Sequence, residues 1–287
     1  MSYLCLYHAD CSDGFGAALA FQLYCEANSM TCEFVPMHYG DTPPDTTDRH
    51  VLVVDFSFKR DVLLEMNRKA KFMRVIDHHK SAEQELSDLT FCIFDLNHSG
   101  AVLTWMFFFP NAPVPLLFKY LEDRDLWRWK LPNSHEVSAA VKSYPAVFEQ
   151  WRRWLNDEAV NDLSNEGEAI LRYQAGEVAR MVKNAYEIRF AGFNVLCLNT
   201  NHLISEVGNE LCKGRPFSVT YFDLEDKRVF SLRSEDRGSS LDVSELAKRY
   251  GGGGHPHAAG FSVEMTPELK RMLWSFSELD LKQTPIL

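Results

Sequence analysis

Val51-Leu52-Val53-Val54-Asp55 and Val75-Ile76-Asp77-His78-His79 are the stretches that determine the fold of this 287-residue chain. Each contains apolar residues that run directly into an acid, and continuous runs such as Val51–Val54 are typical of strands buried on both faces of a parallel sheet. The amphipathic segments between these runs predict helices, and the alternation predicts parallel βαβ units. The strands expected in this part are Tyr3–His8, Cys32–Tyr39, Val51–Asp55, Phe72–Asp77 and Phe91–Asp95, and the helices are Gly14–Glu26 and Lys59–Lys69.

The rest of the chain predicts helices followed by a second α/β domain. The pattern is helical from Ser99 to Tyr186, and its charged last part, residues 156–189, is a natural place for a domain boundary. Beyond it, strands are expected at Asn194–Leu198, Phe217–Asp223 and Val229–Leu232, and helices at Ser205–Leu211 and Val243–Tyr250. The expected fold is a two-domain α/β protein, with a parallel-sheet domain over residues 1–155, a helical linker over 156–189 and a smaller domain over 190–287.

Charge and composition exclude several classes of protein. The 30 Lys and Arg residues against 40 Asp and Glu give a net charge of −10, whereas a protein that grips long nucleic acid needs a basic surface. Ser99–Phe118 is uncharged for 20 residues, but Pro110, Pro113 and Pro115 interrupt it, which favours two buried helices over a membrane span. The seven cysteines never occur at C-x-x-C spacing, which favours a reducing, cytoplasmic location.

Acidic and histidine side chains follow three of the expected strands. The first strand ends in His8-Ala9-Asp10-Cys11-Ser12-Asp13-Gly14, the third in Asp55, and the fourth in Asp77-His78-His79. The carboxyl ends of parallel strands line one edge of the sheet, so these groups should converge there. Converging carboxylates repel one another unless a cation neutralises them, and carboxylates with imidazoles suit Mn²⁺ or a similar divalent ion. The pattern predicts a site for two metal ions; taken singly, each Asp could instead be a helix N-cap or a turn residue.

Two further motifs contain candidate substrate contacts. In Glu122-Asp123-Arg124-Asp125-Leu126-Trp127-Arg128-Trp129, Arg124 and Arg128 could bind anionic substrate oxygens near the metals. The alternative is a solvated helix end with two aromatic anchors. In Gly251–Gly260, four consecutive glycines allow the backbone N–H groups to approach an anion, and the alternative is a flexible loop. Together with Arg233, the histidines of this segment predict a local basic pocket.

These five motifs, taken in order along the chain, resemble the DHH phosphoesterase superfamily. The resemblance is to the branch that carries a DHH-associated second domain, as found in nanoRNases and related short-oligonucleotide phosphodiesterases. It covers almost the whole chain and implies a hydrolase of phosphoester bonds, with its active site in the cleft between two domains. It also implies two divalent metal ions, with Mn²⁺ preferred and Mg²⁺ possible.

The resemblance also implies roles for individual residues. His8 and one acid of the first motif would hold one ion, Asp55 would bridge both, and the other acid, His78 and Asp123 would hold the second. Asp77 would support the histidines. The expected metal ligands are His8, Asp10, Asp13, Asp55, His78 and Asp123; the catalytic residues are Asp55, Asp77, His78 and His79; and the substrate contacts are His79, Arg124, Arg128, Arg233, Gly253, Gly254, His255 and His257.

Two of these ligand positions have alternatives. Much of the superfamily spaces its first acids as D-x-D, whereas here Cys11 and Ser12 separate Asp10 from Asp13, and Asp13 matches the family position better. In the later motif, aligning Trp127-Arg128-Trp129 with the family's aromatic–Arg–aromatic ending selects Asp123 as the ligand, with Asp125 as the alternative.

The expected function is metal-dependent hydrolysis of short nucleotide substrates to mononucleotides by a water activated between two metals. Dinucleotides such as pGpG and RNA of a few nucleotides are the expected substrates, and neither long nucleic acid nor a membrane is an expected partner. The alternatives are a 3′-phosphoadenosine-phosphate phosphatase, a cyclic-dinucleotide phosphodiesterase, a pyrophosphatase or polyphosphatase, and a non-catalytic nucleotide sensor. The protein is expected to be a monomer or a homodimer.

Overall fold

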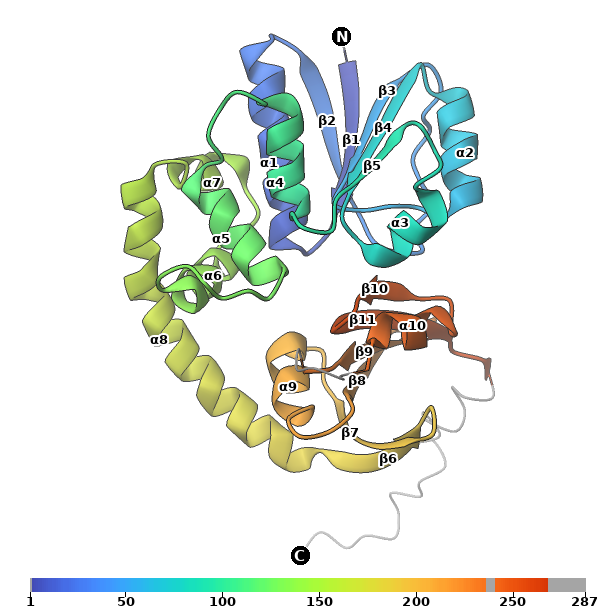
Figure 1. Ribbon diagram of the computed structural model, residues 1–287, viewed down its shortest axis with the longest axis vertical. Helices are drawn as coiled ribbons and strands as arrows, with labels where there is room; N and C mark the ends of the chain where they lie inside the picture. The colour runs from blue at the N-terminus through green and yellow to red at the C-terminus, as the bar shows by residue number, and fades with distance from the viewer. Residues whose placement is uncertain (1, 236–240, 268–287) are drawn as a thin grey trace, which may run out of the picture. The chain divides into compact units, whose positions relative to one another are not determined.

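The chain forms two compact units, Met1–Gly176 and Glu177–Leu287 (Figure 1). The computed structural model describes residues 2–235 and 241–267, so residues 236–240 and 268–287 of the expected second domain lie outside the described residues. The division falls within the long helix α8 (Asp157–Met181). The two units are described separately.

The first unit is built around a parallel sheet of five strands in the order β2-β1-β3-β4-β5. This arrangement confirms the predicted parallel α/β fold. Its elements are β1 (Ser2–His8), α1 (Ser12–Ala27), β2 (Thr31–Met37), β3 (His50–Val54), α2 (Arg60–Lys69), β4 (Phe72–Asp77), α3 (Lys80–Leu86), β5 (Cys92–Phe94), α4 (Gly100–Phe108), α5 (Leu116–Asp125), α6 (Ser134–Ser143), α7 (Phe148–Arg153) and α8.

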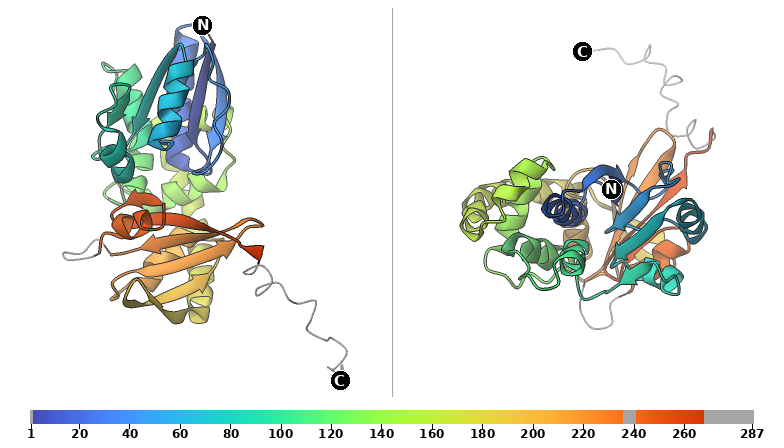
Figure 2. Two further views of the ribbon diagram at one scale, coloured as in Figure 1. Left: turned by 90° about the vertical axis from the view of Figure 1, so that its right-hand side faces the viewer. Right: turned by 90° about the horizontal axis from the view of Figure 1, so that it is seen from above.

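Helices cover both faces of this sheet, which is why its strands are apolar throughout. Successive side chains of a strand point to opposite faces. Val51 and Val53 accordingly pack in the cluster that includes residues of α2 and α3, whereas Leu52 and Val54 pack with residues of α1 and α4. Figures 1 and 2 show α1 and α2 on opposite faces of the sheet. The strand ends are therefore held by a core on both sides.

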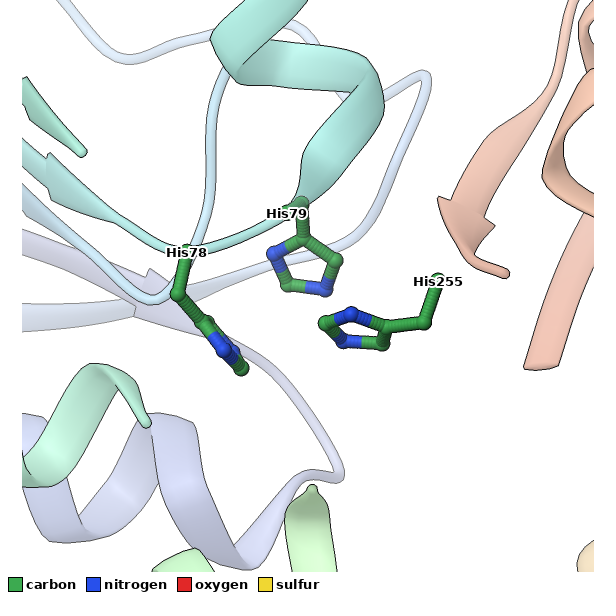
Figure 3. A group of neighbouring side chains, drawn as sticks. All are labelled: His78, His79 and His255. Atoms are coloured by element: carbon green, nitrogen blue, oxygen red, sulfur yellow. The ribbon is translucent and has the colours of Figure 1, made fainter. Parts of the chain in front are cut away.

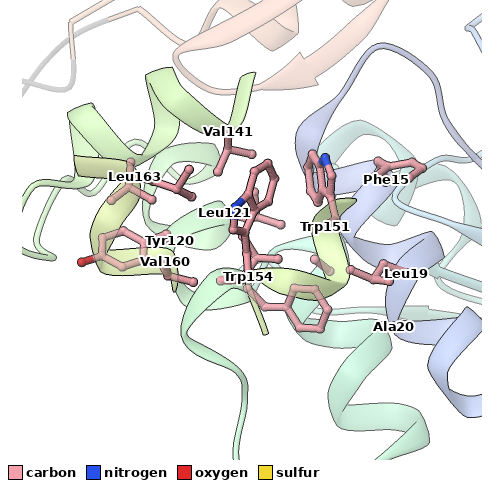
Figure 4. Packing of buried hydrophobic residues seen from close by; sticks show 14 of the residues in the cluster. Phe15, Leu19, Ala20, Tyr120, Leu121, Val141, Trp151, Trp154, Val160 and Leu163 are labelled. Atoms are coloured by element: carbon pink, nitrogen blue, oxygen red, sulfur yellow. The ribbon is translucent and has the colours of Figure 1, made fainter. Parts of the chain in front are cut away.

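A helical layer built from α5, α6, α7 and the start of α8 packs on α1. Trp151 and Trp154 are buried there beside Phe15 and Leu19 of α1, as Figure 4 shows. The uncharged stretch 99–118 contributes α4 and the start of α5, as expected for two buried helices. Within the described ranges, no helix is both long and apolar enough to cross a membrane.

The second unit has a mixed sheet of six strands in the order β10-β11-β9-β8-β7-β6. Along β7, Val195 and Cys197 pack in the cluster that contains α10 residues, whereas Leu196 and Leu198 pack with α9, so the two helices cover opposite faces. Its elements are the 3-10 helix η1 (Val182–Asn184), β6 (Tyr186–Phe190), β7 (Phe193–Asn199), α9 (Ile204–Leu211), β8 (Ser218–Asp223), β9 (Lys227–Arg233), α10 (Val243–Lys248), β10 (Gly253–His255) and β11 (Ala258–Glu264).

One segment of this unit differs from the sequence prediction, and a second excludes the alternative that the sequence left open. Residues 156–189 are not helical throughout, because Tyr186–Phe190 pairs with β7 as the antiparallel edge strand β6. The glycine-rich segment is not a flexible loop, because β10 and β11 form a hairpin that pairs with β9. A Cβ added at Gly252 would lie 2.0 Å from the carbonyl oxygen of Gly260, so close backbone packing requires a glycine there. Both features depend on pairing with other strands, which local sequence patterns do not reveal.

Candidate metal centre

The ends of three adjacent strands bring four of the six predicted ligands together. In the order β1-β3-β4 the strands end at His8, Val54 and Asp77, and Asp55 and His78 follow directly. Because all three strands are parallel, these ends meet at one edge of the sheet, as predicted. Asp13 lies in the first turn of α1, which follows β1.

Two groups of potential metal ligands share Asp55. One consists of His8, Asp55 and His79, and the other of Asp13, Asp55 and His78; within each group the ligand atoms lie within 4.8 Å of one another. Asp55 Oδ2 lies 3.5 Å from His8 Nδ1, and Asp55 Oδ1 lies 3.0 Å from His78 Nε2. Each oxygen of Asp55 therefore faces a different group, which is the arrangement of a carboxylate that bridges two ions. His79 also joins a ligand group, a placement that the sequence did not suggest.

Close backbone packing fixes two of these ligands. Asp55 adopts a left-handed backbone conformation with φ of 53°, and a Cβ added at Gly100 would lie 2.4 Å from Asp55 Cβ. A Cβ at Gly14 would lie 2.3 Å from the carbonyl oxygen of His8. The sequence predictions give neither glycine a role. Gly14 belongs to the first motif and so carries a local signal, whereas Gly100 has none.

Asp77 belongs to neither ligand group, but it contacts both His78 and His79. It accepts hydrogen bonds from His79 Nδ1 at 2.7 Å, from the backbone N–H of His78 at 2.7 Å and from the Ser57 hydroxyl at 2.5 Å. Burial opposes its charge, but His79 and His78 outweigh burial and lower the pKa of Asp77 to about 2. A carboxylate that holds Nδ1–H in this way orients the ring and leaves the lone pair on Nε2. Figure 3 shows His78 and His79 extending from the end of β4.

The charges around His78 favour a cation. Its Nε2 lies 3.0 Å from Asp55, 3.4 Å from Asp125 and 3.8 Å from Asp13. Burial, together with the Asp55 and Asp125 carboxylates, raises the pKa of Asp13 well above its usual value. Burial disfavours the charged forms of both Asp55 and His78, yet their mutual contact prevails, lowering the pKa of Asp55 and raising that of His78.

Several buried atoms at this place have no hydrogen bond. Among the residues that the structure describes, this is true of His8 Nδ1, Asp13 Oδ2, Asp55 Oδ2 and Asp125 Oδ2. Buried polar atoms without a partner are costly, and metal coordination removes that cost. The combination of carboxylate oxygens and imidazole nitrogens suits divalent ions such as Mn²⁺ or Mg²⁺. The ligand atoms of these residues therefore suit the divalent metal ions that the sequence predicts.

Asp125, and not Asp123, lies beside His78. Both carboxylate oxygens of Asp123 accept backbone N–H groups, from Lys130 at 2.9 Å and from Leu131 at 3.1 Å, so Asp123 holds the turn after α5. This corrects the choice of Asp123 over Asp125. The two residues differ by two positions on a helix, so their side chains point in different directions.

Asp10 lies apart from both ligand groups. Its side chain is 92% exposed and lies 3.1 Å from the ring of His38. Asp13, in the first turn of α1, is buried at the site instead. The expectation that Asp10 is a metal ligand is thus wrong for this structure, because the turn after β1 points it outward.

Arg128 has a structural contact that the sequence did not suggest. Its guanidinium donates to Glu122 Oε1 at 2.9 Å and to the carbonyl oxygen of Asn97. Glu122 Oε2 also accepts the backbone N–H of Ser99 at 3.0 Å, next to Gly100. Arg128 and Glu122 therefore hold the segment that packs on Asp55. Arg124 lies over the ring of Trp127, 6.0 Å from its centre.

Two of the predicted basic residues of the second unit, Arg233 and His255, share one row of its sheet. The register pairs His255 with Ala258 and Ala258 with Arg233 across β10, β11 and β9, so His255 and Arg233 point to the same face. Arg233 donates to the Ser205 hydroxyl at 3.0 Å. His257 lies in the hairpin turn, where its Nδ1 is 3.0 Å from the Ser234 hydroxyl, and Gly253 and Gly254 belong to β10.

Comparisons with known proteins agree with this architecture. The DHHA1 domain model matches residues 200–279. An uncharacterized protein, R106 of Acanthamoeba polyphaga mimivirus, is 30% identical over 281 residues, which cover 90% of this chain and 66% of R106. Oligoribonuclease NrnB of Bacillus subtilis (strain 168) is 26% identical over 219 residues, covering 67% of this chain and 53% of NrnB. This chain thus spans between about half and two thirds of the length of these curated relatives.

A solved structure of RecJ in complex with Mn²⁺ from Thermus thermophilus has the same fold. Its TM-score is 0.55 at 14% identity, covering 96% of this chain and 52% of that one. The chain belongs to the DHH superfamily of phosphoesterases and carries a DHHA1 domain. Asp77-His78-His79 is then its DHH motif. Membership confirms the family that the sequence motifs resemble.

Metal binding at the DHH motif is expected to release protons. The pKa values of His78 and Asp13 are both raised, so each side chain keeps its proton to a higher pH than usual, and a binding ion has to displace any proton that is present. Metal affinity should therefore rise with pH, including the range above the ordinary histidine pKa of about 6.5. Calorimetric titration with Mn²⁺ in two buffers of different ionisation enthalpy measures the release. Equal heats in both buffers would contradict this prediction.

Replacing Asp123 and Asp125 one at a time by asparagine should separate effects on metal binding from effects on stability. Asp125→Asn is expected to weaken Mn²⁺ binding with little change in the unfolding temperature of the metal-free protein. Asp123→Asn should instead destabilise the protein by about 1–3 kcal/mol, because one backbone N–H loses its charged acceptor. Calorimetry and thermal unfolding in EDTA measure the two effects, and the reverse pattern would restore Asp123 as the ligand.

Proposed function

We propose that this protein is a metal-dependent phosphodiesterase that hydrolyses short nucleotide substrates to mononucleotides. The observation that supports this most is the pair of ligand groups joined by Asp55, with each oxygen facing one group. A second support is the similarity to NrnB, whose name describes an oligoribonuclease. We take Mn²⁺ as the preferred ion and Mg²⁺ as the alternative.

The residues at this site would have different roles. Divalent ions held there would supply a water of lowered pKa and positive charge beside the phosphate. Asp55 would bridge the ions, with His8 and His79 on one side and Asp13, His78 and Asp125 on the other. Asp77 fixes the ring of His79 through Nδ1, so that Nε2 is oriented toward an ion or the phosphate.

The second unit would supply a phosphate contact of its own. Arg233 and His255 lie in one row of its sheet, and the backbone of Gly253 and Gly254 belongs to the same hairpin. A row that contains a guanidinium and an imidazole suits one phosphate. It does not form the long basic track that extended single strands need, and the net charge of −10 agrees with a short substrate. We therefore propose dinucleotides such as pGpG as substrates.

A substrate panel with added Mn²⁺ tests this proposal. We expect turnover of pGpG and ApA, and faster cleavage of two-nucleotide RNA than of five- or twenty-nucleotide RNA. Faster cleavage of the longest RNA would reject the short-substrate proposal. Turnover of only 3′-phosphoadenosine phosphate, a cyclic dinucleotide or pyrophosphate would select the corresponding alternative, and nucleotide binding without turnover would indicate a sensor.

A further inference from the structure

Trp127 occupies a position where a helix normally ends in glycine. After α5, the N–H of Trp127 donates to the carbonyl of Arg124 at 2.9 Å, and the N–H of Arg128 donates to that of Asp123 at 2.8 Å. This is the hydrogen-bond pattern of a Schellman motif, whose left-handed residue is usually glycine. Trp127 adopts φ of 54° there, which is unfavourable for a residue with a Cβ.

The side chain of Trp127 contacts two neighbouring side chains, but the residue is partly exposed to solvent. It is 40% exposed, meets the ring of Trp129 edge-on at 4.9 Å, and has the Arg124 guanidinium 6.0 Å from its centre. Trp129 is itself anchored, because it stacks on His135 at 3.7 Å with an angle of 9° between the planes. A rigid, exposed indole in a strained backbone conformation contributes little to folding, and such outliers gather at functional sites.

Trp127 lies close to the metal centre along the chain. Asp125, whose carboxylate lies 3.4 Å from His78 Nε2, precedes Trp127 by two residues, so their Cα atoms are no more than about 7.6 Å apart. In a nucleotide, the base lies one sugar ring away from its phosphate. A phosphate at the ligand groups thus places an attached base within reach of this part of the chain.

We propose that Trp127 is a stacking site for a nucleobase of the substrate. Stacking on an aromatic ring is tolerant of base identity, because every base presents a π-face. Trp127 would therefore select nucleotide esters over other phosphoesters without reading a particular sequence. The identity of the ligand rests on the proposed function, but the stacking itself can be measured separately.

Trp127→Gly separates stacking from stability. Because glycine is favoured at this backbone conformation, the variant should unfold at the same or a higher temperature than the wild type. Its KM for ApA should rise roughly five- to 150-fold, the usual effect of losing one aromatic stacking partner. The KM for an analogue in which hydrogen replaces both bases should not change, and Trp127→Phe should recover part of the lost affinity for ApA.

Phe72→Ala is the matched control. Phe72 is also an exposed aromatic residue, at 43%, but it begins β4, at the opposite end of the strand from Asp77. Its replacement should leave the KM for ApA unchanged. An unchanged KM for ApA in Trp127→Gly, or an equal rise for the analogue without bases, would overturn the stacking proposal.

Fluorescence distinguishes this proposal from the proposed function. If the wild type hydrolyses no nucleotide ester, the phosphodiesterase proposal fails, and AMP is then titrated in the presence of Mg²⁺. Quenching of wild-type fluorescence that is lost in Trp127→Phe would support stacking without catalysis. Equal quenching in both proteins, or none in either, would reject the stacking site.

Discussion

Replacing Asp55 with asparagine is expected to lower the turnover of dinucleotides by more than about 100-fold, because loss of even an outer-shell partner typically costs 10–100-fold. Asp55 is the one acid that belongs to both ligand groups. Asparagine has the same shape and tolerates the left-handed backbone at this position, so the variant should fold. Mn²⁺-dependent hydrolysis of ApA and calorimetric Mn²⁺ binding measure the effect.

Asp10→Asn is a suitable control for this variant. It makes the same chemical change at an acid of the first motif, but its exposed side chain lies apart from both groups. Turnover by Asp10→Asn should therefore equal that of the wild type. Wild-type turnover by Asp55→Asn would contradict the two-metal proposal, and a large loss in Asp10→Asn would return that residue to the site.

The second large effect is expected from Gly100→Ala, which adds one methyl group beside the bridging acid. The new Cβ would lie 2.4 Å from Asp55 Cβ and 2.9 Å from Asp55 Cα, so Asp55 has to move. A displacement of about 1 Å in a catalytic group can lower activity by about 100-fold. Overpacking should also destabilise the first unit by about 1–3 kcal/mol. Hydrolysis of ApA and thermal unfolding in EDTA test both effects.

Gly176→Ala provides the matched control. A Cβ at this α8 position has nothing within 4 Å, and alanine is favoured over glycine in helices by about 1 kcal/mol. The control should keep full activity and be at least as stable as the wild type. Full activity of Gly100→Ala would mean that contact with Gly100 does not fix the position of Asp55.

The fold could be predicted wherever the signal is local. Continuous apolar runs such as Val51–Val54 indicated strands covered on both faces, and the structure has α1 and α4 on one face and α2 and α3 on the other. The prediction failed where pairing is non-local. Tyr186–Phe190 continued a helical pattern in sequence, yet it gains its hydrogen bonds from β7. The glycines of β10 similarly reflect close contact with β11, which no local pattern reports.

The sequence alone determined that acids and histidines meet at one edge of a parallel sheet, because strand direction and alternation follow from local patterns. Only the tertiary structure placed Asp10 outside the site and put Asp125, in place of Asp123, beside His78. It also showed that Gly100 packs on Asp55. Side-chain direction at a turn or helix end, and contact between residues far apart in the chain, are set by packing. Residue type and spacing alone do not encode them.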